Sequence, residues 1–434
     1  MIIRSISNRL LLFHLACSLG ASPAVAENWP HWRGPRFDGT STETGLPTIW
    51  SGDQNVRWRL PLPGPAGSTP VVWGDRLYLT STHKDGDSLH VLAVSRDGEL
   101  AWQREVDRGT QKVFPSLASE TTLASPSPVT DGEHLWVLFG TAKVMAIDRG
   151  GKEIWKRDLA ADYGQPKTYF GLSSSLLLDD GKLYVQMLHT DRQLVLALDP
   201  QTGKELWVHD RKTDARDECL HSYASPTLFR AGEEKLLLIH GADYLTAHRP
   251  SDGAEAWRHG GLNPEDSYNP SFRLVATPVV ADGLVVLPTA KRGPVYGLRP
   301  AGAKGDITGS ESHTAWHMER GTPDVPSPLV HDGLVYLNGE KGTLTVLDTG
   351  SGEELYAERV HQSNHRGSPV YADGKIYLTG TDGTVSVVRA GRTFELLAKN
   401  TVDGYLASSP AISDGTIYLR SYEALFAIAE SSGE

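Results

Sequence analysis

A pattern that recurs about every 50 residues constrains the fold of this 434-residue chain more than any other feature. One copy runs from Ser368 to Leu378 with the sequence SPVYADGKIYL, and similar copies surround Pro70, Pro128, Pro226, Pro278, Pro328 and Pro410. Leu176 replaces the proline in one further copy, so successive copies are separated by 58, 48, 50, 52, 50, 41 and 41 residues. A period of this size is typical of an array of units that share one core. The chain therefore contains eight repeats.

Each repeat predicts four short strands. A proline at the first residue of strand one is tolerated, because a missing N–H costs little at that position. Asp-Gly follows strand one in six of the eight repeats, and this dipeptide is the strongest short-range signal for a β-hairpin. Strand three ends in an Ala-x-Asp sequence, a Thr-Gly or Gly turn follows, and strand four carries a tryptophan, as in residues 197–207 (ALDPQTGKELW).

Eight four-stranded antiparallel units predict an all-β fold, the eight-bladed β-propeller, whose blades surround a central channel. Ring closure favours this fold over a β-solenoid. The eighth repeat stops after Ile428 without a fourth strand, whereas residues 56–59 offer a tryptophan-bearing strand that belongs to no repeat. We expect these two segments to pair and to close the ring. A seven-bladed ring is an alternative, since the sixth repeat has Tyr356 in the tryptophan position and the seventh has no clear tryptophan.

Tryptophan is frequent, with 11 residues, and six of these hold corresponding places in the predicted blades. The strand-three alanine and the strand-four tryptophan are separated by 9, 9, 10 and 10 residues in the repeats that end at Trp102, Trp155, Trp207 and Trp257. A small residue at a fixed distance from a large flat one suits packing between neighbouring sheets. We therefore predict a structural role, and not ligand stacking, for Trp58, Trp102, Trp155, Trp207, Trp257 and Trp316.

The N-terminus has the pattern of a secretory signal peptide. A basic start is followed by an apolar stretch from Leu10 to Leu19 and by the small residues Ala24-Val25-Ala26. We expect residues 1–26 to be removed and the protein to act in the periplasm or outside the cell. A lipid anchor on Cys17 is an alternative that His14 disfavours, because lipoprotein signals have an aliphatic residue there. No later stretch reaches the roughly 18 apolar residues of a transmembrane helix.

The rest of the chain divides into three expected parts. Residues 27–54 are a tryptophan-rich segment that packs on the propeller, residues 55–430 form the propeller, and residues 431–434 are a tail. The net charge is −11, from 42 Lys and Arg against 53 Asp and Glu, and no basic run occurs, which argues against nucleic acid as a partner. Two cysteines are too few for a disulfide scaffold, a four-cysteine zinc site or a thiolate-held iron–sulfur cluster.

The repeat and the segment before it resemble a known family. The Ala-x-Asp-x-x-Thr-Gly-x-x-x-Trp pattern is similar to the pyrroloquinoline-quinone (PQQ) type repeat of quinoprotein dehydrogenases and of the outer-membrane assembly lipoprotein BamB. The head sequence NWPHWRGPRFDGTS at residues 28–41, with GLPTIW at residues 45–50, resembles secreted PQQ-like propellers of planctomycete-type bacteria. The resemblance covers residues 28–430 and implies the propeller fold. It implies no single chemistry, because many members are thought to bind no quinone.

A quinone enzyme of this family implies a vicinal cysteine pair, a tryptophan under the quinone ring, and Glu, Asn or Asp ligands for calcium. Cys17 and Cys219 are not adjacent, and no Cys-x-x-Cys-His is present to attach a haem. We therefore predict no cofactor and no metal. PQQ with calcium belongs to the alternative in which the protein is an oxidoreductase.

A binding site is expected at one mouth of the channel, where the loops from strand four of one blade to strand one of the next converge. Aromatic, imidazole, guanidinium and carboxylate groups in these loops are typical of a polar-ligand pocket. The candidate binding residues are His221, Tyr223, Asn269, Arg273, Asp324, His365, Arg366 and Tyr405. Among these, the imidazole and guanidinium donors can hold a carboxylate, a phosphate or a quinone. A solvated rim without a ligand is the alternative, since any propeller has polar loops there.

The fold by itself does not give the function. The sequence favours an exported, non-catalytic scaffold that presents one face to an envelope protein, a glycan or a small polar ligand. The alternatives are a quinoprotein-like oxidoreductase with its cofactor at the channel mouth, and a propeller hydrolase or lyase without assignable catalytic residues. Two stretches exceed the repeat, Val106–Leu123 and Arg299–Thr314, and are candidate lids or docking loops.

Overall fold

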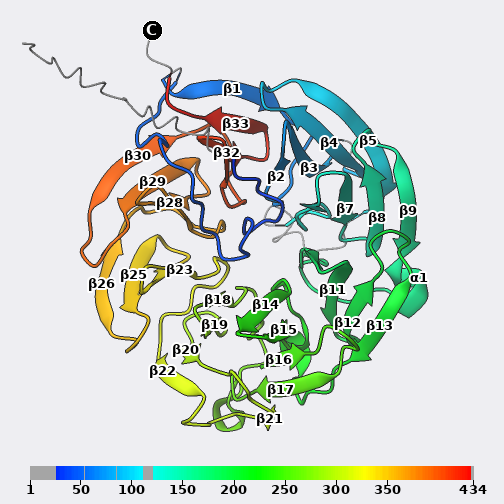
Figure 1. Cartoon of the computed structure of the whole chain (residues 1–434), viewed down its shortest axis with the longest axis vertical. Coiled ribbons are helices and arrows are strands. Elements are labelled where there is room, and N and C mark those ends of the chain that lie inside the picture. Colours follow the sequence, from blue (N-terminus) through cyan, green and yellow to red (C-terminus); the bar gives the residue numbers. More distant parts are fainter. Residues whose placement is uncertain (1–25, 53, 85, 111–120, 432–434) are drawn as a thin grey trace, which may run out of the picture.

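Eight antiparallel sheets follow one another around a central channel (Figure 1). The computed structural model describes residues 26–52, 54–84, 86–110 and 121–431. The chain forms the eight-bladed propeller that the repeats predict, and the seven-bladed alternative is wrong. Residues 1–25 of the expected signal peptide, with Cys17, and residues 432–434 of the expected tail lie outside the described residues.

Blade 1 contains β2 (Val71–Trp73), β3 (Arg76–Thr82), β4 (Ser88–Ser95) and β5 (Leu100–Arg108), and blade 2 contains β6 (Val129–Thr130), β7 (His134–Leu138), β8 (Lys143–Asp148) and β9 (Glu153–Asp158). Blade 3 contains β10 (Leu177–Asp179), β11 (Lys182–His189), β12 (Arg192–Leu198) and β13 (Glu205–Asp210), and blade 4 contains β14 (Thr227–Ala231), β15 (Glu234–Gly241), β16 (Tyr244–His248) and β17 (Glu255–His259). Blade 5 contains β18 (Val279–Ala281), β19 (Leu284–Pro288), β20 (Val295–Leu298) and β22 (Thr314–Met318), and blade 6 contains β23 (Leu329–His331), β24 (Leu334–Asn338), β25 (Thr343–Asp348) and β26 (Glu354–Arg359). Blade 7 contains β27 (Val370–Ala372), β28 (Lys375–Thr379), β29 (Thr384–Arg389) and β30 (Leu396–Thr401), and blade 8 contains β31 (Ala411–Ser413), β32 (Thr416–Arg420), β33 (Ala424–Ile428) and the N-terminal β1 (Val56–Pro61).

The helical segments are short and lie in loops between blades. Among the described residues they are α1 (Leu159–Tyr163) and the 3-10 helices Asp217–Leu220 and Glu265–Ser267. Among the described residues, no helix has the length and apolar character needed to cross a membrane.

The Asp-Gly turns set the register between strands one and two. In five of the six, both residues have positive φ, as in Asp180 (49°) and Gly181 (66°), which is the geometry of a type I′ hairpin. Asp131 differs, because its side chain accepts hydrogen bonds from the backbone N–H groups of Glu133 and His134 instead. The sequence signal therefore predicted the turn at each site and its exact type at five.

The N-terminal strand closes the ring as predicted. β1 pairs antiparallel with β33, from Val56 opposite Ile428 to Pro61 opposite Ala424. The two strands, blue and red in Figure 1, lie side by side although they come from opposite ends of the chain. Blade 8 is thereby completed as a four-stranded sheet and does not leave an open edge at the C-terminus.

The strand-four tryptophans link neighbouring blades. The indole N–H donates to a backbone oxygen in the β-turn between strands three and four of the next blade at 2.7 to 3.0 Å, for Trp58, Trp102, Trp155, Trp207 and Trp316. The same rings cover the glycines of those turns so closely that a Cβ atom would lie only 2.4 to 2.8 Å from them. The side chain of Trp257 is fully buried, and its backbone pairs with that of Gly305 in a parallel strand. These contacts explain why glycine recurs after strand three.

Two matched glycine substitutions test the contact between a strand-four tryptophan and the turn glycine of the next blade. Gly203 and Gly181 both have positive φ, but a Cβ at Gly203 would lie 2.6 Å from the Trp155 ring, whereas nothing lies within 4 Å at Gly181. Gly203→Ala should therefore reduce the free energy of unfolding by about 1–3 kcal/mol more than Gly181→Ala, because overpacking adds to the shared backbone cost. Denaturant unfolding of both variants measures the difference, and equal destabilisation would contradict the packing role of Trp155.

The stretch Arg299–Thr314 does not form a lid over the channel. Its residues Gly305–Asp306 form β21, which pairs in parallel with β17 and adds a fifth strand to the outer edge of blade 4. This addition covers an edge that would otherwise present unpaired backbone groups. Of the other long stretch, Val106–Leu123, residues 111–120 lie outside the described part of the chain.

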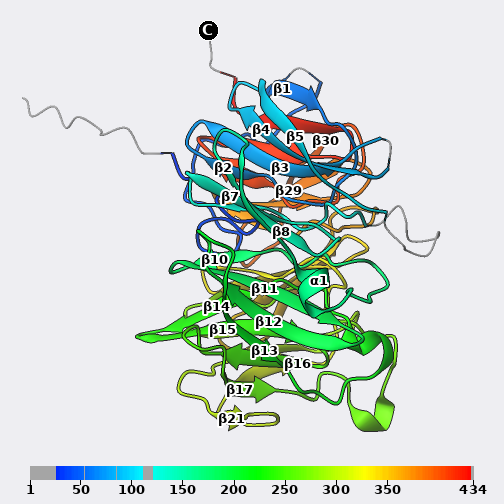
Figure 2. The same cartoon turned by 90° about the vertical axis from the view of Figure 1, so that its right-hand side faces the viewer.

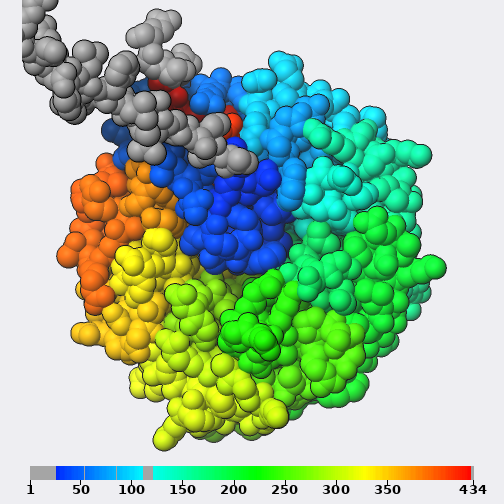
Figure 3. All heavy atoms as spheres, in the orientation of Figure 1, coloured from blue at the N-terminus to red at the C-terminus, as the bar shows by residue number. Residues whose placement is uncertain are grey.

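Residues 27–54 lie on the face of the ring that carries the turns between strands one and two. Trp29 exchanges two backbone hydrogen bonds of 2.8 Å with Val72 of blade 1. The Glu43 carboxylate accepts from the backbone N–H groups of Asp414 and Gly415 in blade 8. Between these contacts the segment crosses the centre of the ring, where it appears in dark blue in Figure 3. In the edge-on view of Figure 2, this segment and α1 lie on opposite faces.

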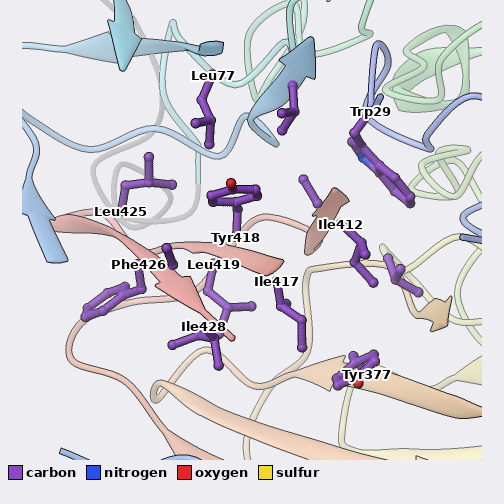
Figure 4. Close-up of a cluster of buried hydrophobic side chains, with 14 of the residues drawn as sticks. Trp29, Leu77, Tyr377, Ile412, Ile417, Tyr418, Leu419, Leu425, Phe426 and Ile428 are labelled. Carbon is purple, nitrogen blue, oxygen red and sulfur yellow. The ribbon is translucent and has the colours of Figure 1, made fainter. Parts of the chain in front are cut away.

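The tryptophans of this segment enter the core. Trp29 and Trp50 are fully buried in the cluster formed by blades 1, 7 and 8. Figure 4 shows Trp29 near Leu77 of blade 1 and Ile412 of blade 8. The N-terminal segment is thus part of the folded propeller and covers one mouth of its channel.

Candidate binding site

A ring of eight hydroxyl groups lines the channel. They belong to the residues that precede strand one, namely Thr69, Ser127, Ser175, Ser225, Thr277, Ser327, Ser368 and Ser409. At seven blade interfaces, the backbone N–H of one ring residue donates to the hydroxyl oxygen of the next at 2.9 to 3.0 Å. The serine of the repeat therefore joins neighbouring blades at the channel wall, just as the tryptophan joins them at the outside.

The channel holds a cavity of about 200 Å³. Trp32 of the N-terminal segment lines it at the covered face. The residues two positions before each ring residue form the wall toward the other face; they are Gly67, Ser125, Ser173, Tyr223, Val275, Val325, Arg366 and Ala407. Phe170, Thr121 and Arg273 line it nearer the loops between blades. The only mouth that the described residues leave open is therefore the one at which the sequence placed a site.

Arg33 follows Trp32 in the N-terminal segment and is buried. Its guanidinium group donates to the backbone oxygens of Pro328 at 2.6 Å, Pro369 at 3.0 Å and Asp38 at 2.6 Å. Burial lowers the pKa of Arg33 to about 10, so the group stays charged at neutral pH. One cation thus joins the N-terminal segment to blades 6 and 7.

Six side chains of alternating charge run along the open mouth. Arg273 lies 3.4 Å from Glu218 and 3.9 Å from Asp324. Lys291 lies 3.5 Å from Asp324 and 2.8 Å from Glu340, which in turn lies 3.8 Å from Arg366. We call Glu218, Arg273, Asp324, Lys291, Glu340 and Arg366 the rim network. It spans loops of blades 3 to 7 and carries no net formal charge.

The pKa values of the rim carboxyls Glu218 and Glu340 are shifted in opposite directions by their surroundings. Burial raises the pKa of Glu218, and Arg273 offsets only part of that effect. Burial also acts to raise the pKa of Glu340, but the hydrogen bond from Lys291 and the charges of Lys291, Arg366 and Lys341 together outweigh it, and the pKa is lowered. Arg273 also lies 4.6 Å from the centre of the Phe170 ring, a cation–π distance. Beyond Arg273, a groove of about 890 Å³ continues over blade 5 beside Lys291, Arg292 and Arg320.

The structure brings four of the eight predicted binding residues to the mouth. Tyr223, Arg273 and Arg366 line the channel, and Asp324 joins Arg273 in the rim network and in the groove over blade 5. Tyr223 is buried, and its hydroxyl oxygen accepts from the backbone N–H of Phe170 at 3.3 Å. These four residues come from loops between four different pairs of blades.

The other four predicted residues do not line the channel. His221 and His365 are buried against Thr190 and Asn338, at 2.9 and 3.1 Å. Burial lowers the pKa of each imidazole to about 4, so neither is a cationic donor at neutral pH. Asn269 accepts from Ser271 within its own loop and borders only the groove over blade 5. Tyr405 packs against Tyr422, 4.8 Å between ring centres.

Several residues of the site escaped prediction. Lys291 and Glu340 lie in turns between strands two and three, which reach the same face as the loops between blades in an antiparallel blade. The ring hydroxyls had a signal in the sequence, since Ser or Thr stands before strand one in all eight repeats. Trp32 and Arg33 had none, because nothing in their local sequence shows that they face the channel.

A buried carboxyl next to this site makes stability depend on pH. Asp243, 5% exposed, accepts from the Tyr268 hydroxyl at 2.8 Å, yet burial raises the pKa of its carboxyl from the usual 3.8 to about 6. The ionised form is therefore disfavoured in the folded state, so stability falls as pH rises from about 4 to 6. Asp243→Asn should gain about 1–3 kcal/mol over the wild type at pH 7 and little at pH 4, as measured by denaturant unfolding. A pH-independent difference would contradict the shift.

The donors at this site fit a calcium-bound quinone poorly. No group of three His, Cys, Asp or Glu side chains among the described residues is arranged to hold a metal ion. Hard cations such as calcium take six to eight oxygen ligands, mostly carboxylates, whereas each rim carboxylate already faces a Lys or Arg. The donor chemistry instead suits a ligand that accepts hydrogen bonds from hydroxyl and guanidinium groups.

Comparison with known proteins agrees with the fold. A family model described as "Outer membrane protein assembly factor BamB" matches residues 41–124, 104–296 and 267–434. The chain belongs to this BamB-like family of PQQ-type propellers. BamB from Moraxella catarrhalis has a similar structure, with 16% identity and a TM-score of 0.57 over 88% of this chain and 99% of that one. At this identity the likeness shows the fold alone.

Solved dehydrogenase structures are also similar in fold. A europium-containing methanol dehydrogenase superposes with a TM-score of 0.69 at 13% identity, over 93% of this chain and 89% of the enzyme. A quinohemoprotein alcohol dehydrogenase from Comamonas testosteroni has a TM-score of 0.65 at 13% identity, over 94% and 81%. A polyvinylalcohol dehydrogenase from Sphingopyxis sp. (strain 113P3) is 25% identical over 210 residues, which are 44% of this chain. The chain matches only 30% of that relative's length.

Proposed function

We propose that this protein is an exported, non-catalytic propeller scaffold that docks an envelope protein on its open face. The rim network carries the proposal, because it places three cations and three anions on loops around one mouth while the N-terminal segment occupies the other. Paired charges of both signs suit a polar protein surface and give specificity to a docking interface. Membership of the BamB-like family, described as an assembly factor, supports a protein-binding role.

The open face also offers apolar contact. Tyr169 is 43% exposed beside the mouth and meets His221 edge-on, with 4.8 Å between ring centres. Tyrosine is enriched at the centres of protein interfaces, where a few aromatic and Arg side chains carry most of the binding energy. A partner that covers Tyr169, Arg273 and Arg366 would combine these contributions.

The test is capture of partners from an envelope extract of the organism that produces the protein. A rim variant, Arg273→Glu with Lys291→Glu and Arg366→Glu, reverses three charges at the open mouth. The matched control, Arg104→Glu with Arg359→Glu and Lys399→Glu, reverses three on outer strands. We expect wild type and control to retain the same partner and the rim variant to lose it. Equal recovery by all three proteins would show that the open face is not the docking surface.

An oxidoreductase is the competing function, favoured by the structural likeness to alcohol dehydrogenases. It predicts that PQQ with calcium raises the melting temperature of the purified protein and supports dye-linked oxidation of an alcohol. The scaffold proposal predicts neither effect. Dye reduction that requires both PQQ and calcium would replace the scaffold with the enzyme.

A further inference from the structure

The charged groups that line the channel have one sign. Arg273 and Arg366 line it, and no carboxylate does so within the described part of the chain. Two more guanidinium groups are buried outside the lining: Arg33, which follows Trp32 in the chain, and Arg420, which donates to the backbone oxygen of Ser68 beside the hydroxyl ring at 3.2 Å. Burial lowers the pKa of Arg420 to about 9, so it too stays charged at neutral pH. The two charged side chains that line the channel are therefore both cationic, and each also pairs with a carboxylate of the rim network.

The channel wall also holds unused donors. Each ring hydroxyl that accepts a backbone N–H keeps its own O–H, and within the described residues none of these O–H groups meets a protein acceptor. The ring residues are at least nine-tenths buried, so bulk water does not satisfy them freely. The Trp32 indole N–H at the base is likewise buried without an acceptor among the described residues. Buried donors of this kind need an acceptor inside the cavity.

The size of the cavity and its aromatic lining limit the kind of ligand that can bind there. A cavity of about 200 Å³ has the volume of roughly seven water molecules at about 30 Å³ each, which is enough for one sugar-sized molecule. Trp32, Phe170 and Tyr223 supply aromatic surface to the wall. We propose that the channel binds one small organic anion, a carboxylate with a hydroxylated body such as a sugar acid. This proposal does not rest on the proposed docking function, although both use Arg273 and Arg366 at the open mouth.

Different residues of the channel contact different parts of the ligand in this proposal. The guanidinium groups of Arg273 and Arg366, at the open end, meet the carboxylate, since Arg is suited to bidentate binding of this group. The rim network holds both in position, with Glu340 3.8 Å from Arg366 and Glu218 3.4 Å from Arg273. The ring O–H groups donate to the hydroxyl oxygens deeper in the channel. Trp32 of the N-terminal segment lines the cavity at the covered face.

Glucuronate and glucose test the proposal, because they share one ring and differ by a carboxylate. Calorimetric titration of the purified full chain should show glucuronate binding at least about tenfold more tightly than glucose, which corresponds to about 1.4 kcal/mol. Arg366→Gln should weaken glucuronate about tenfold or more. Arg359→Gln, on the outer strand β26, removes the same charge away from the channel and should leave binding unchanged. Glucuronate should also change tryptophan fluorescence, and Trp32→Phe should abolish that change.

Several results would overturn the proposal. Equal affinity for glucose and glucuronate would show that charge is not recognised, and no binding of glucuronate at about 10 mM would show that the site does not take this class of ligand. Inorganic phosphate binding as tightly as glucuronate would exclude recognition of the hydroxylated body. Unchanged binding by Arg366→Gln would place the ligand elsewhere. The titration uses the purified chain alone, so its failure is distinguishable from a failure of protein docking.

Discussion

A chain that starts at Leu62, and so lacks β1, should lose cooperative unfolding. β1 is the outer strand of blade 8, and its side chains Val56, Trp58 and Leu60 pack against the core shared by blades 1, 7 and 8. Trp58 also docks on the neighbouring blade, where its indole N–H donates to the Arg96 backbone oxygen at 2.7 Å. Removal of one large core aromatic alone costs about 3–5 kcal/mol, and loss of the strand adds its backbone pairing with β33.

A chain that starts at Asn55 is the matched control, because it keeps β1 and lacks only the preceding segment. Circular dichroism and tryptophan fluorescence in a denaturant series should give one coincident transition for this control. For the chain from Leu62 we expect a broad transition or separate ones, and rapid cleavage in β31 to β33. A sharp transition at the same midpoint for both chains would show that ring closure by β1 contributes little.

Arg33→Met should detach the N-terminal segment from the channel and lower the free energy of unfolding by about 3 kcal/mol or more. The substitution removes the donor from the backbone oxygens of Pro328, Pro369 and Asp38, and each buried acceptor left unpaired costs about 1–3 kcal/mol. Arg33→Lys keeps the charge, but a lysine has no planar fork of donors to reach several acceptors. Its free energy of unfolding should therefore lie between those of Arg33→Met and the wild type.

Arg36→Met provides the control on the same segment. Arg36 is partly exposed and pairs with Glu27, and such surface pairs contribute at most about 1 kcal/mol. Denaturant unfolding measures stability, and limited proteolysis between residues 27 and 54 reports detachment. If Arg33→Met is no less stable and no more readily cleaved than Arg36→Met, the Arg33 contacts do not hold the segment in place.

The fold was predictable because each repeat carries its own local signals. Asp-Gly reports a hairpin through the φ angles that it favours, and the fixed interval from alanine to tryptophan follows from a cross-strand pair such as Ala197 opposite Trp207. Eight copies of a local signal reinforce one another. Ring closure followed from a missing fourth strand at one end of the chain and an unassigned strand, around Trp58, at the other.

The candidate site was predictable only in part. Loop position correctly brought Tyr223, Arg273 and Arg366 to the channel, because the connections between blades must reach one face. Loop position does not tell which side chains turn inward. His221 and His365 stand beside channel-lining neighbours in the sequence, yet they are buried in the blades and lose their charge there. Burial depends on packing that no local pattern encodes.

The sequence by itself determined the eight blades, their turns and the strand that closes them, since these follow from periodic and local preferences. Only the tertiary structure decided where residues 27–54 lie, because Arg33 donates to backbone oxygens about 300 positions away in contacts that repeat nowhere. The same holds for the rim network, whose ion pairs join loops of different blades. Contacts between distant, unrepeated residues arise from chain geometry, and they decide that the N-terminal segment covers one mouth of the channel while the rim network lies at the other.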